Sequence, residues 1–305
     1  MGAWDRDQVA AVFRTMRPCR AGYLLEGIAM ATQGPHALLP VPDHDEAARQ
    51  AFVETVGRTV LPLLPTINKA ALKSRVGLRL AHALGDEPMT RHHRRRAMAA
   101  EPMWQMTSAL RLTHQETLWD SVTSSVERQL PQLVQKAVTL RGKRRYATLD
   151  LDSSIGIPRY LNAVDIHMMP GNYDRERLED DVSAGAIYDR GVFLRALGLR
   201  GAYGEDYGTS FGAYVRAQYP ELNVRRVLEL GCACGGSTLG LADAFPEADV
   251  FAVDVAAPML RYAQARMESL GKKAHFQQQN AEHLSFESNS FDVVVGFALL
   301  HETSA

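Results

Sequence analysis

The sequence predicts an α/β protein in which a Rossmann-like parallel sheet follows a mainly α-helical N-terminal domain. Between residues 227 and 297, short apolar runs alternate with amphipathic helical segments, and a glycine-rich turn follows the first run. Upstream of residue 145, apolar residues recur at helical rather than alternating spacing. These observations predict a helical domain over residues 1–145, a connector over 146–173 and an α/β domain over 174–305.

Four short segments predict the strands of the sheet. They cover residues 227–230, 250–253, 274–279 and 291–297. Pro258 and Gly271 favour the first turn and the end of a helix between the second and third strands. Strands that alternate with helices form right-handed βαβ units, so we expect a parallel sheet whose ligands lie across the carboxyl ends of the strands.

The turn after the first strand, residues 229–236, has the composition of a ligand-binding loop. Because Gly231 and Gly235 carry no side chain, backbone N–H groups and a helix N-terminus can approach a ligand closely there. The second strand ends on Asp254, a carboxylate that can accept hydrogen bonds from both hydroxyls of a ribose. The sequence therefore predicts a site for a small-molecule cofactor.

Four motifs lie in order along this domain: Leu228-Glu-Leu-Gly231 with Gly235, the acid Asp254, Asn280-Ala-Glu282, and Ser290-Phe-Asp-Val-Val294. Together they resemble the class I S-adenosylmethionine-dependent methyltransferases, especially the group that includes the ubiquinone/menaquinone C-methyltransferases. The resemblance implies S-adenosylmethionine as cofactor, with its methionine part on the glycine loop, its ribose on the acid and its adenine after the third strand. The implied cofactor-binding residues are Glu229, Gly231, Ala233, Gly235, Asp254, Asn280, Ala281 and, by its position before the first strand, Tyr207.

Two residues depart from the family pattern. Ala233 replaces the middle glycine of the loop and adds one methyl group beside the cofactor. Asn280 replaces the usual acid at the adenine corner, although its amide oxygen can still accept a hydrogen bond from an amino group.

Two other functions fit parts of the same sequence. Gly231, Ala233 and Gly236 match a relaxed dinucleotide fingerprint, which would suit an NAD-dependent dehydrogenase. Against that function, Glu229 places a charge inside the first strand, and the start of the fourth strand follows the methyltransferase pattern. A non-catalytic cofactor-binding or interaction module is the remaining alternative.

His301 is the predicted catalytic residue. His301 and Glu302 follow the fourth strand directly, at the sheet edge where cofactor and substrate meet in open α/β folds, and histidine accepts protons near neutral pH. His167 could face the same site, although a structural, hydrogen-bonded histidine is the commoner arrangement.

Composition restricts the partners and the location. The formal net charge of −1 argues against a nucleic-acid binder, and the run Arg91–Arg96 is interpreted as a solvated helix face. We therefore predict a small-molecule acceptor. Three cysteines are too few for a disulfide framework or a structural zinc site, so no metal and a cytoplasmic location are predicted. No apolar run reaches the roughly 20 residues that span a bilayer.

The helical domain carries one strong pattern. Leu118, Val122, Val126 and Leu130 form an apolar stripe at a spacing of four residues. Thr113 and Glu116 have the spacing of a capping box, which predicts the start of this helix. Pro131 predicts a kink or a break in it.

The resembled sheet has the strand order 3-2-1-4-5-7-6, and the sequence ends just after the fourth strand. We therefore expect the fourth strand, with Val293, Val294 and Val295, to lie at an edge that can pair with another chain. The expectation is that the 305 residues belong to a longer protein, or that a partner, including a second copy, completes the sheet.

Overall fold

The computed structural model describes residues 32–163 and 165–303, and it confirms the predicted α/β fold. The described residues belong to one compact unit, in which the N-terminal helices pack against the helices of the sheet. Cys19 and the other expectations for residues 1–31 lie outside the described residues.

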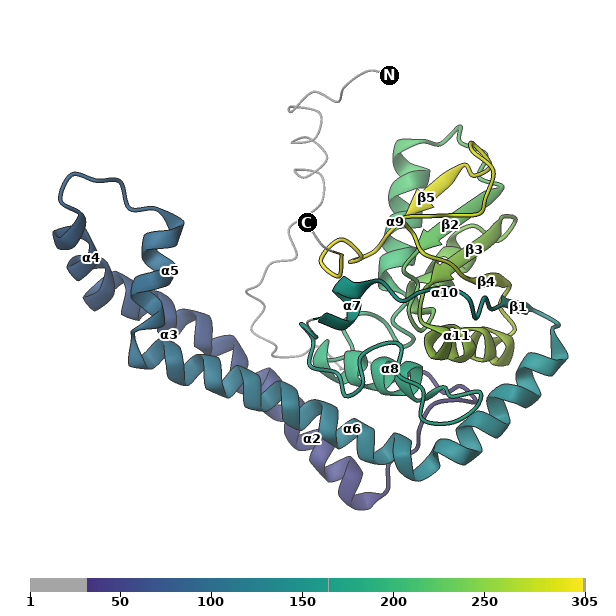
Figure 1. Cartoon of the computed structure of the whole chain (residues 1–305), viewed down its shortest axis with the longest axis horizontal. Coiled ribbons are helices and arrows are strands. Elements are labelled where there is room, and N and C mark those ends of the chain that lie inside the picture. The colour runs from purple at the N-terminus through teal and green to yellow at the C-terminus, as the bar shows by residue number, and fades with distance from the viewer. Residues whose placement is uncertain (1–31, 164, 304–305) are drawn as a thin grey trace. The chain divides into compact units, whose positions relative to one another are not determined.

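The sheet has five parallel strands (Figure 1). They are β1 (Ala147–Asp150), β2 (Arg226–Leu230), β3 (Asp249–Asp254), β4 (Ala274–Gln278) and β5 (Val293–Val295). Their order is β1-β4-β3-β2-β5, and every neighbouring pair runs parallel. The four predicted strands therefore have the predicted order. Strands β3 and β4 lie on one side of β2 and β5 lies on the other, so the switch point of the sheet is at β2, and the loop after β2 lies at the centre of the carboxyl edge.

Strand β1 is the fifth strand, and it lies in the segment predicted to be a connector. Glu268 fixes its start, because the Glu268 carboxylate accepts hydrogen bonds from the backbone N–H groups of Arg145, Tyr146 and Ala147 at 2.8 to 3.1 Å. The sequence did not predict β1 because only one of its four residues, Ala147, is buried, so no apolar run marks it.

Five helices belong to the α/β part that the structure describes. They are α7 (Arg159–Ala163), α8 (Ser183–Arg195), α9 (Asp206–Gln218), α10 (Gly236–Ala244) and α11 (Ala257–Leu270). Residues of α9 and α10 form a core with β2, β3 and β5, whereas α11 packs on β1, β3 and β4. Pro258 and Gly271 begin and end α11 as predicted, with Gly271 in the left-handed conformation at φ 68°.

The N-terminal helices are α2 (His44–Thr59), η1 (Leu61–Leu63), α3 (Leu64–Ala71), the π-helical turn η2 (Leu72–Val76), α4 (Gly77–Leu84), α5 (Arg91–Ala99) and α6 (Pro102–Lys143). The predicted capping box at Thr113 is wrong, since α6 begins eleven residues earlier with Glu101 as N-cap. A break at Pro131 is also wrong: α6 continues through it, and Figure 1 shows the helix bending in its second half. Among the described residues, no helix combines the length and apolar content needed to cross a bilayer.

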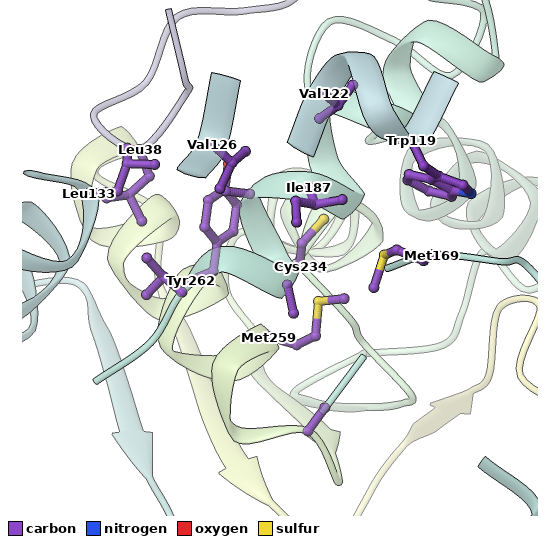
Figure 2. Close-up of a cluster of buried hydrophobic side chains, with 14 of the residues drawn as sticks. Leu38, Trp119, Val122, Val126, Leu133, Met169, Ile187, Cys234, Met259 and Tyr262 are labelled. Atoms are coloured by element: carbon purple, nitrogen blue, oxygen red, sulfur yellow. The ribbon is translucent and has the colours of Figure 1, made fainter. Parts of the chain in front are cut away.

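The largest core joins α6 to the α/β part (Figure 2). Val122 and Val126 of the predicted apolar stripe are fully buried and lie in one cluster with Ile187 of α8 and Tyr262 of α11. Tertiary packing on both sides therefore stabilises α6 and compensates for the hydrogen bond that Pro131 cannot donate.

Strand β5 lies at an edge of the sheet, as predicted. Val293 and Val295 are buried, whereas Val294 between them is 54% exposed. The Asp292 carboxylate accepts hydrogen bonds from the backbone N–H groups of Arg225 and Arg226 at 2.8 Å, which fixes the start of β5 against β2. Pairing of this edge with another chain stays a prediction.

Candidate functional site

The glycine loop after β2 is held in a tight, left-handed course. Gly231, Ala233 and Gly235 have φ values of 71°, 46° and 77°. The N–H groups of Gly231 and Cys232 both donate to the carbonyl oxygen of Val253, at 2.8 and 3.1 Å, so the loop is tied to the end of β3. Ala233 therefore occupies a conformation that favours glycine. It is also the position at which this sequence has alanine instead of the family's middle glycine.

Asp254 closes the other side of this loop. Its carboxylate accepts hydrogen bonds from the N–H of Ala233 at 2.9 Å and from the N–H of Ala256 at 3.0 Å. Burial raises the pKa of Asp254, against the opposing effect of these backbone hydrogen bonds. Since each carboxylate oxygen has two lone pairs, both oxygens keep acceptor capacity for a ribose.

A pocket beside the glycine loop contains Tyr207, whose role in cofactor binding stays a prediction, and also a cation, Arg200, that the sequence did not indicate. The ring of Tyr207 stacks on Phe297, with ring centroids 5.8 Å apart, and the guanidinium carbon of Arg200 lies 4.7 Å from the Tyr207 centroid. The residues that line the pocket include Tyr188, Arg200, Tyr207, Gly231, Ala233, Ser237 and Phe297. Arg200 belongs to no recognisable sequence motif, so its position in the pocket is seen only in the folded structure.

Glu229, predicted as a cofactor-binding residue, lies beneath the loop. Its side chain is fully buried in β2, and its carboxylate accepts hydrogen bonds from the hydroxyls of Ser237 and Thr238 in the first turn of α10. Burial raises the pKa of Glu229 to about 7, although both hydroxyls act to lower it. In this structure Glu229 joins the strand to the helix that follows the loop.

This position gives a pH-dependent prediction for Glu229→Gln. The raised pKa means that the folded protein favours the protonated acid, so the contribution of Glu229 to stability is fully present below pH 4.5 and is lost as pH rises through about 7. The free energy of unfolding of the parent, relative to Glu229→Gln, should therefore fall by roughly 3 kcal/mol between pH 4.5 and 8. Urea unfolding of both proteins at several pH values measures this difference. A difference that does not change with pH would show that Glu229 stays ionised.

Asn280 and Ala281 lie after β4, at the predicted adenine corner. The amide oxygen of Asn280 accepts a hydrogen bond from the N–H of Glu282 at 2.9 Å, which holds the turn. A depression there is lined by residues that include Asp150, Asp152, Gln279 and Asn280. Strand β1 and the residues after it thus bring two acids to the predicted adenine corner, and the role of Asn280 in adenine binding stays a prediction.

His301 lies in a cluster of polar side chains from two distant segments. Its Nε2 atom is 3.0 Å from Nε2 of His167 and 3.0 Å from Oε1 of Glu302. The same Glu302 oxygen is 2.7 Å from Nε2 of His167 and accepts a hydrogen bond from the hydroxyl of Tyr173 at 3.0 Å. The structure therefore brings His167 and Glu302, which the sequence also indicated, together with His301, and it adds Tyr173.

The charges in this cluster are defined by Glu302. Burial would raise the pKa of Glu302, but the hydrogen bonds from His167 and Tyr173 outweigh it, and the net shift is downward. An ionised carboxylate only accepts hydrogen bonds, so Nε2 of His167, which lies 2.7 Å from Glu302, carries a proton. Arg195 lies 3.4 Å from Nδ1 of His167, while Nδ1 of the half-exposed His301 forms no hydrogen bond with the described residues.

The same cluster has the spacing of a metal site, since ligand atoms of His167, His301 and Glu302 all lie within 4.8 Å of one another. A metal on Nε2 of His167 would require a proton on Nδ1, where the Arg195 guanidinium also offers only N–H groups. This geometry favours a hydrogen-bonded cluster over a metal site.

The thiols of Cys232 and Cys234 are buried and unpaired, and the absence of a metal stays a prediction.

Comparison with known proteins links this site to a family. Residues 227–305 match the family model described as a methyltransferase domain. An uncharacterised protein of Haemophilus influenzae is 40% identical over 78 residues, which are 25% of this chain and 31% of that protein. A trans-aconitate 2-methyltransferase of Afipia carboxidovorans is 35% identical over 79 residues, 26% of this chain and 29% of that enzyme.

A demethylmenaquinone methyltransferase of Thermus thermophilus is 32% identical over 91 residues, 28% of this chain and 41% of that enzyme. Among solved structures, a magnesium protoporphyrin IX methyltransferase from Synechocystis with bound SAH is 22% identical, with a TM-score of 0.27, over 42% of this chain and 50% of that one. The chain spans less than a third of the length of the first three curated relatives. The residues that match the family model include the glycine loop, Asp254 and His301.

Proposed function

We propose that this chain, whose residues 227–305 belong to the class I S-adenosylmethionine-dependent methyltransferases, binds that cofactor at the carboxyl edge of the sheet and methylates a small molecule. The single observation that carries the proposal is the glycine loop, which is tied to Asp254 through Ala233 and opens onto the pocket of Arg200 and Tyr207. The cofactor supplies an electrophilic methyl group on a sulfonium.

The residues present fit this cofactor. A Cβ atom on Gly236 would lie 3.0 Å from the carbonyl oxygen of Gly204, so glycine at this position lets the loop pack closely on the residues before α9. The guanidinium of Arg200 lies over the ring of Tyr207, and it forms no ion pair with a carboxylate of the described residues. We assign Arg200 to the cofactor's carboxylate and Asp254 to its ribose.

His301 would accept the acceptor's proton through Nδ1. Glu302 orients the ring through Nε2 and stabilises the imidazolium that forms, as a carboxylate does for histidine in other acid–base sites. Burial and the neighbouring Tyr188 and Glu302 raise the pKa of Tyr173, so its hydroxyl stays protonated and continues to donate to Glu302. This arrangement suits an acceptor that loses a proton on methylation.

A small-molecule acceptor is supported by two of the relatives, which are named for trans-aconitate and demethylmenaquinone. Sequence composition gives no surplus of positive charge over the whole chain. We also keep the predicted cytoplasmic location, which the buried, unpaired thiols of Cys232 and Cys234 support.

Calorimetric titration with S-adenosylmethionine, S-adenosylhomocysteine and NAD tests the cofactor assignment. Binding of the first two without NAD supports the proposal, whereas binding of NAD alone would restore the dehydrogenase alternative. Release of S-adenosylhomocysteine with a panel of small acceptors then separates an enzyme from a non-catalytic cofactor-binding module.

For Asp254→Ala we expect cofactor binding to weaken by roughly 1.5–3 kcal/mol, because hydrogen bonds to a charged group are lost. Titration calorimetry measures the dissociation constant. Asp249→Ala is the matched control, since Asp249 lies at the opposite end of β3 and should leave the constant unchanged. An unchanged constant in Asp254→Ala would contradict the ribose assignment.

For His301→Ala and Glu302→Gln we expect turnover to fall about 100-fold or more, while the dissociation constant for the cofactor changes little. A positioned general base acts in the transition state, so its loss affects kcat rather than cofactor binding. His44→Ala is the control, because its side chain is 96% exposed in α2. Activity equal to the parent in both variants would assign the cluster to loop structure.

A further inference from the structure

The segment from residue 61 to residue 100, here named the basic lobe, has a charge that differs from the rest of the chain. It comprises η1, α3, η2, α4 and α5. It holds eight lysines and arginines against two acids, Asp86 and Glu87, although the whole chain has a formal net charge of −1. The eight cations are Lys69, Lys73, Arg75, Arg79, Arg91, Arg94, Arg95 and Arg96.

All eight cations are exposed. Arg75 and Arg79 bind the carboxylate of Glu101 at 2.7 and 3.1 Å. Within the part of the chain that the structure describes, the other six cations form no ion pair. The run Arg91–Arg96 contributes four of these six, so the face predicted to be merely solvated is part of a larger cationic surface.

The basic lobe also exposes apolar side chains. No residue of α4 is buried, although five of its eight residues are leucine or alanine. Leu78 of α4 is 71% exposed and Leu63 of η1 is 58% exposed. The core of the lobe is small, with Ala71, Val76 and Met98 as its buried members. Apolar helices beside many lysines and arginines are typical of segments that lie in a membrane interface.

We propose that the basic lobe docks on the surface of an anionic phospholipid membrane. Phosphate headgroups complement the unpaired cations, and the acyl boundary below them accepts the exposed leucines. A nucleic acid would complement the cations alone and would leave Leu63 and Leu78 in water. The docking is peripheral, which agrees with the lack of a membrane-crossing helix among the described residues.

The lobe is separated from the cofactor site by α6. This helix begins at Pro102, two residues after the lobe, and its Gln115 donates a hydrogen bond to the carbonyl oxygen of His167, so about 20 Å of helix at 1.5 Å per residue lie between the lobe and that residue. Substitutions on the lobe surface should therefore leave cofactor binding unchanged, and the docking proposal does not depend on the proposed function.

The test is flotation of the whole chain with phosphatidylcholine vesicles, with and without phosphatidylglycerol. We expect binding only to the anionic vesicles, and weaker binding as salt rises. Each cation near such a surface strengthens binding roughly fivefold, so replacing Arg91, Arg94, Arg95 and Arg96 by glutamate should weaken it at least about a hundredfold. The matched control reverses four exposed cations elsewhere, Arg49, Lys136, Lys143 and Lys273, and should keep most of the binding.

A second variant separates the apolar contribution. Leu63→Ser with Leu78→Ser should weaken vesicle binding roughly tenfold without changing the charge. Circular dichroism verifies that each variant is folded. Equal binding to neutral and anionic vesicles, or equal binding of parent and glutamate variant, would overturn the proposal. The proposal would also be overturned if the chain bound single-stranded DNA or polyglutamate more tightly than anionic vesicles and the serine variant kept that binding. The lobe would then bind a polyanion or a different macromolecule.

Discussion

Replacing Gly231 with valine is expected to lower the affinity for S-adenosylmethionine at least about a hundredfold while the helices stay folded. Gly231 has a φ of 71°, a conformation that costs an L-residue roughly 1–2 kcal/mol and suits a β-branched one least. A Cβ atom there would lie 2.7 Å from Cδ1 of Leu299, so the branched side chain also crowds the loop after β5. Titration calorimetry measures the affinity, and circular dichroism measures the fold.

Gly85→Val is the matched control for this experiment. Gly85 also has a left-handed φ, 56°, but a Cβ atom on it meets no atom within 4 Å. The control therefore shares the backbone strain without the crowding, and it should bind the cofactor like the parent. Global unfolding of Gly231→Val would show that this glycine is structural first, and unchanged affinity would remove the loop from the cofactor site.

The sheet and the glycine loop could be predicted because their signals are local. Strands β2, β3 and β5 each contain an apolar run, and the turns between the strands contain glycine, proline or acids at positions where these residues have a physical role. Asp254 was found for the same reason, since it ends a buried strand at the carboxyl edge.

Elements that depend on distant contacts could not be predicted. Strand β1 is stabilised by Glu268, which lies more than 100 residues later in the sequence. Helix α6 passes through Pro131 because α8 and α11 pack against it, and local propensity contains no information on that packing. Thr113 has the spacing of a capping box, but a longer helix includes it.

The residues of the candidate site also divide into those that local sequence signals predict and those that depend on distant contacts. His301 was predicted from its place after a strand, whereas its partner His167 comes from a turn 134 residues earlier, and only the fold brings the two rings to 3.0 Å. Glu229 was assigned to the cofactor because its motif is adjacent to the loop, yet the alternation of side chains along a strand places its carboxylate against Ser237 and Thr238.

A buried ion pair behind the glycine loop was also beyond sequence analysis. Arg266 of α11 and Asp189 of α8 have side chains 1% and 7% exposed, with Nη2 and Oδ1 3.4 Å apart. Arg266 also donates to the carbonyl oxygens of Cys234, in the glycine loop, and of Tyr203, which lines the pocket. Burial would raise the pKa of Asp189, but Arg266 and the hydrogen bond from His36 hold it below its usual value, so the carboxylate stays charged.

For Arg266→Met we expect the free energy of unfolding to fall by about 3–5 kcal/mol, because a buried carboxylate loses its cationic partner. Urea unfolding measures this loss. Lys272→Met is the control: Lys272 follows α11 and pairs with Asp243 on the surface, where both side chains are at least 40% exposed, so its loss should cost about 1 kcal/mol or less.

The double variant Arg266→Met with Asp189→Leu separates charge from packing. It leaves neither charge of the pair uncompensated, so we expect it to recover much of the stability lost in Arg266→Met. It still lacks the hydrogen bond from Arg266 to Cys234, so its affinity for S-adenosylmethionine should stay below that of the parent. If both stability and affinity recovered together, Arg266 would only balance the charge of Asp189; if neither recovered, packing rather than the buried charge would explain the loss.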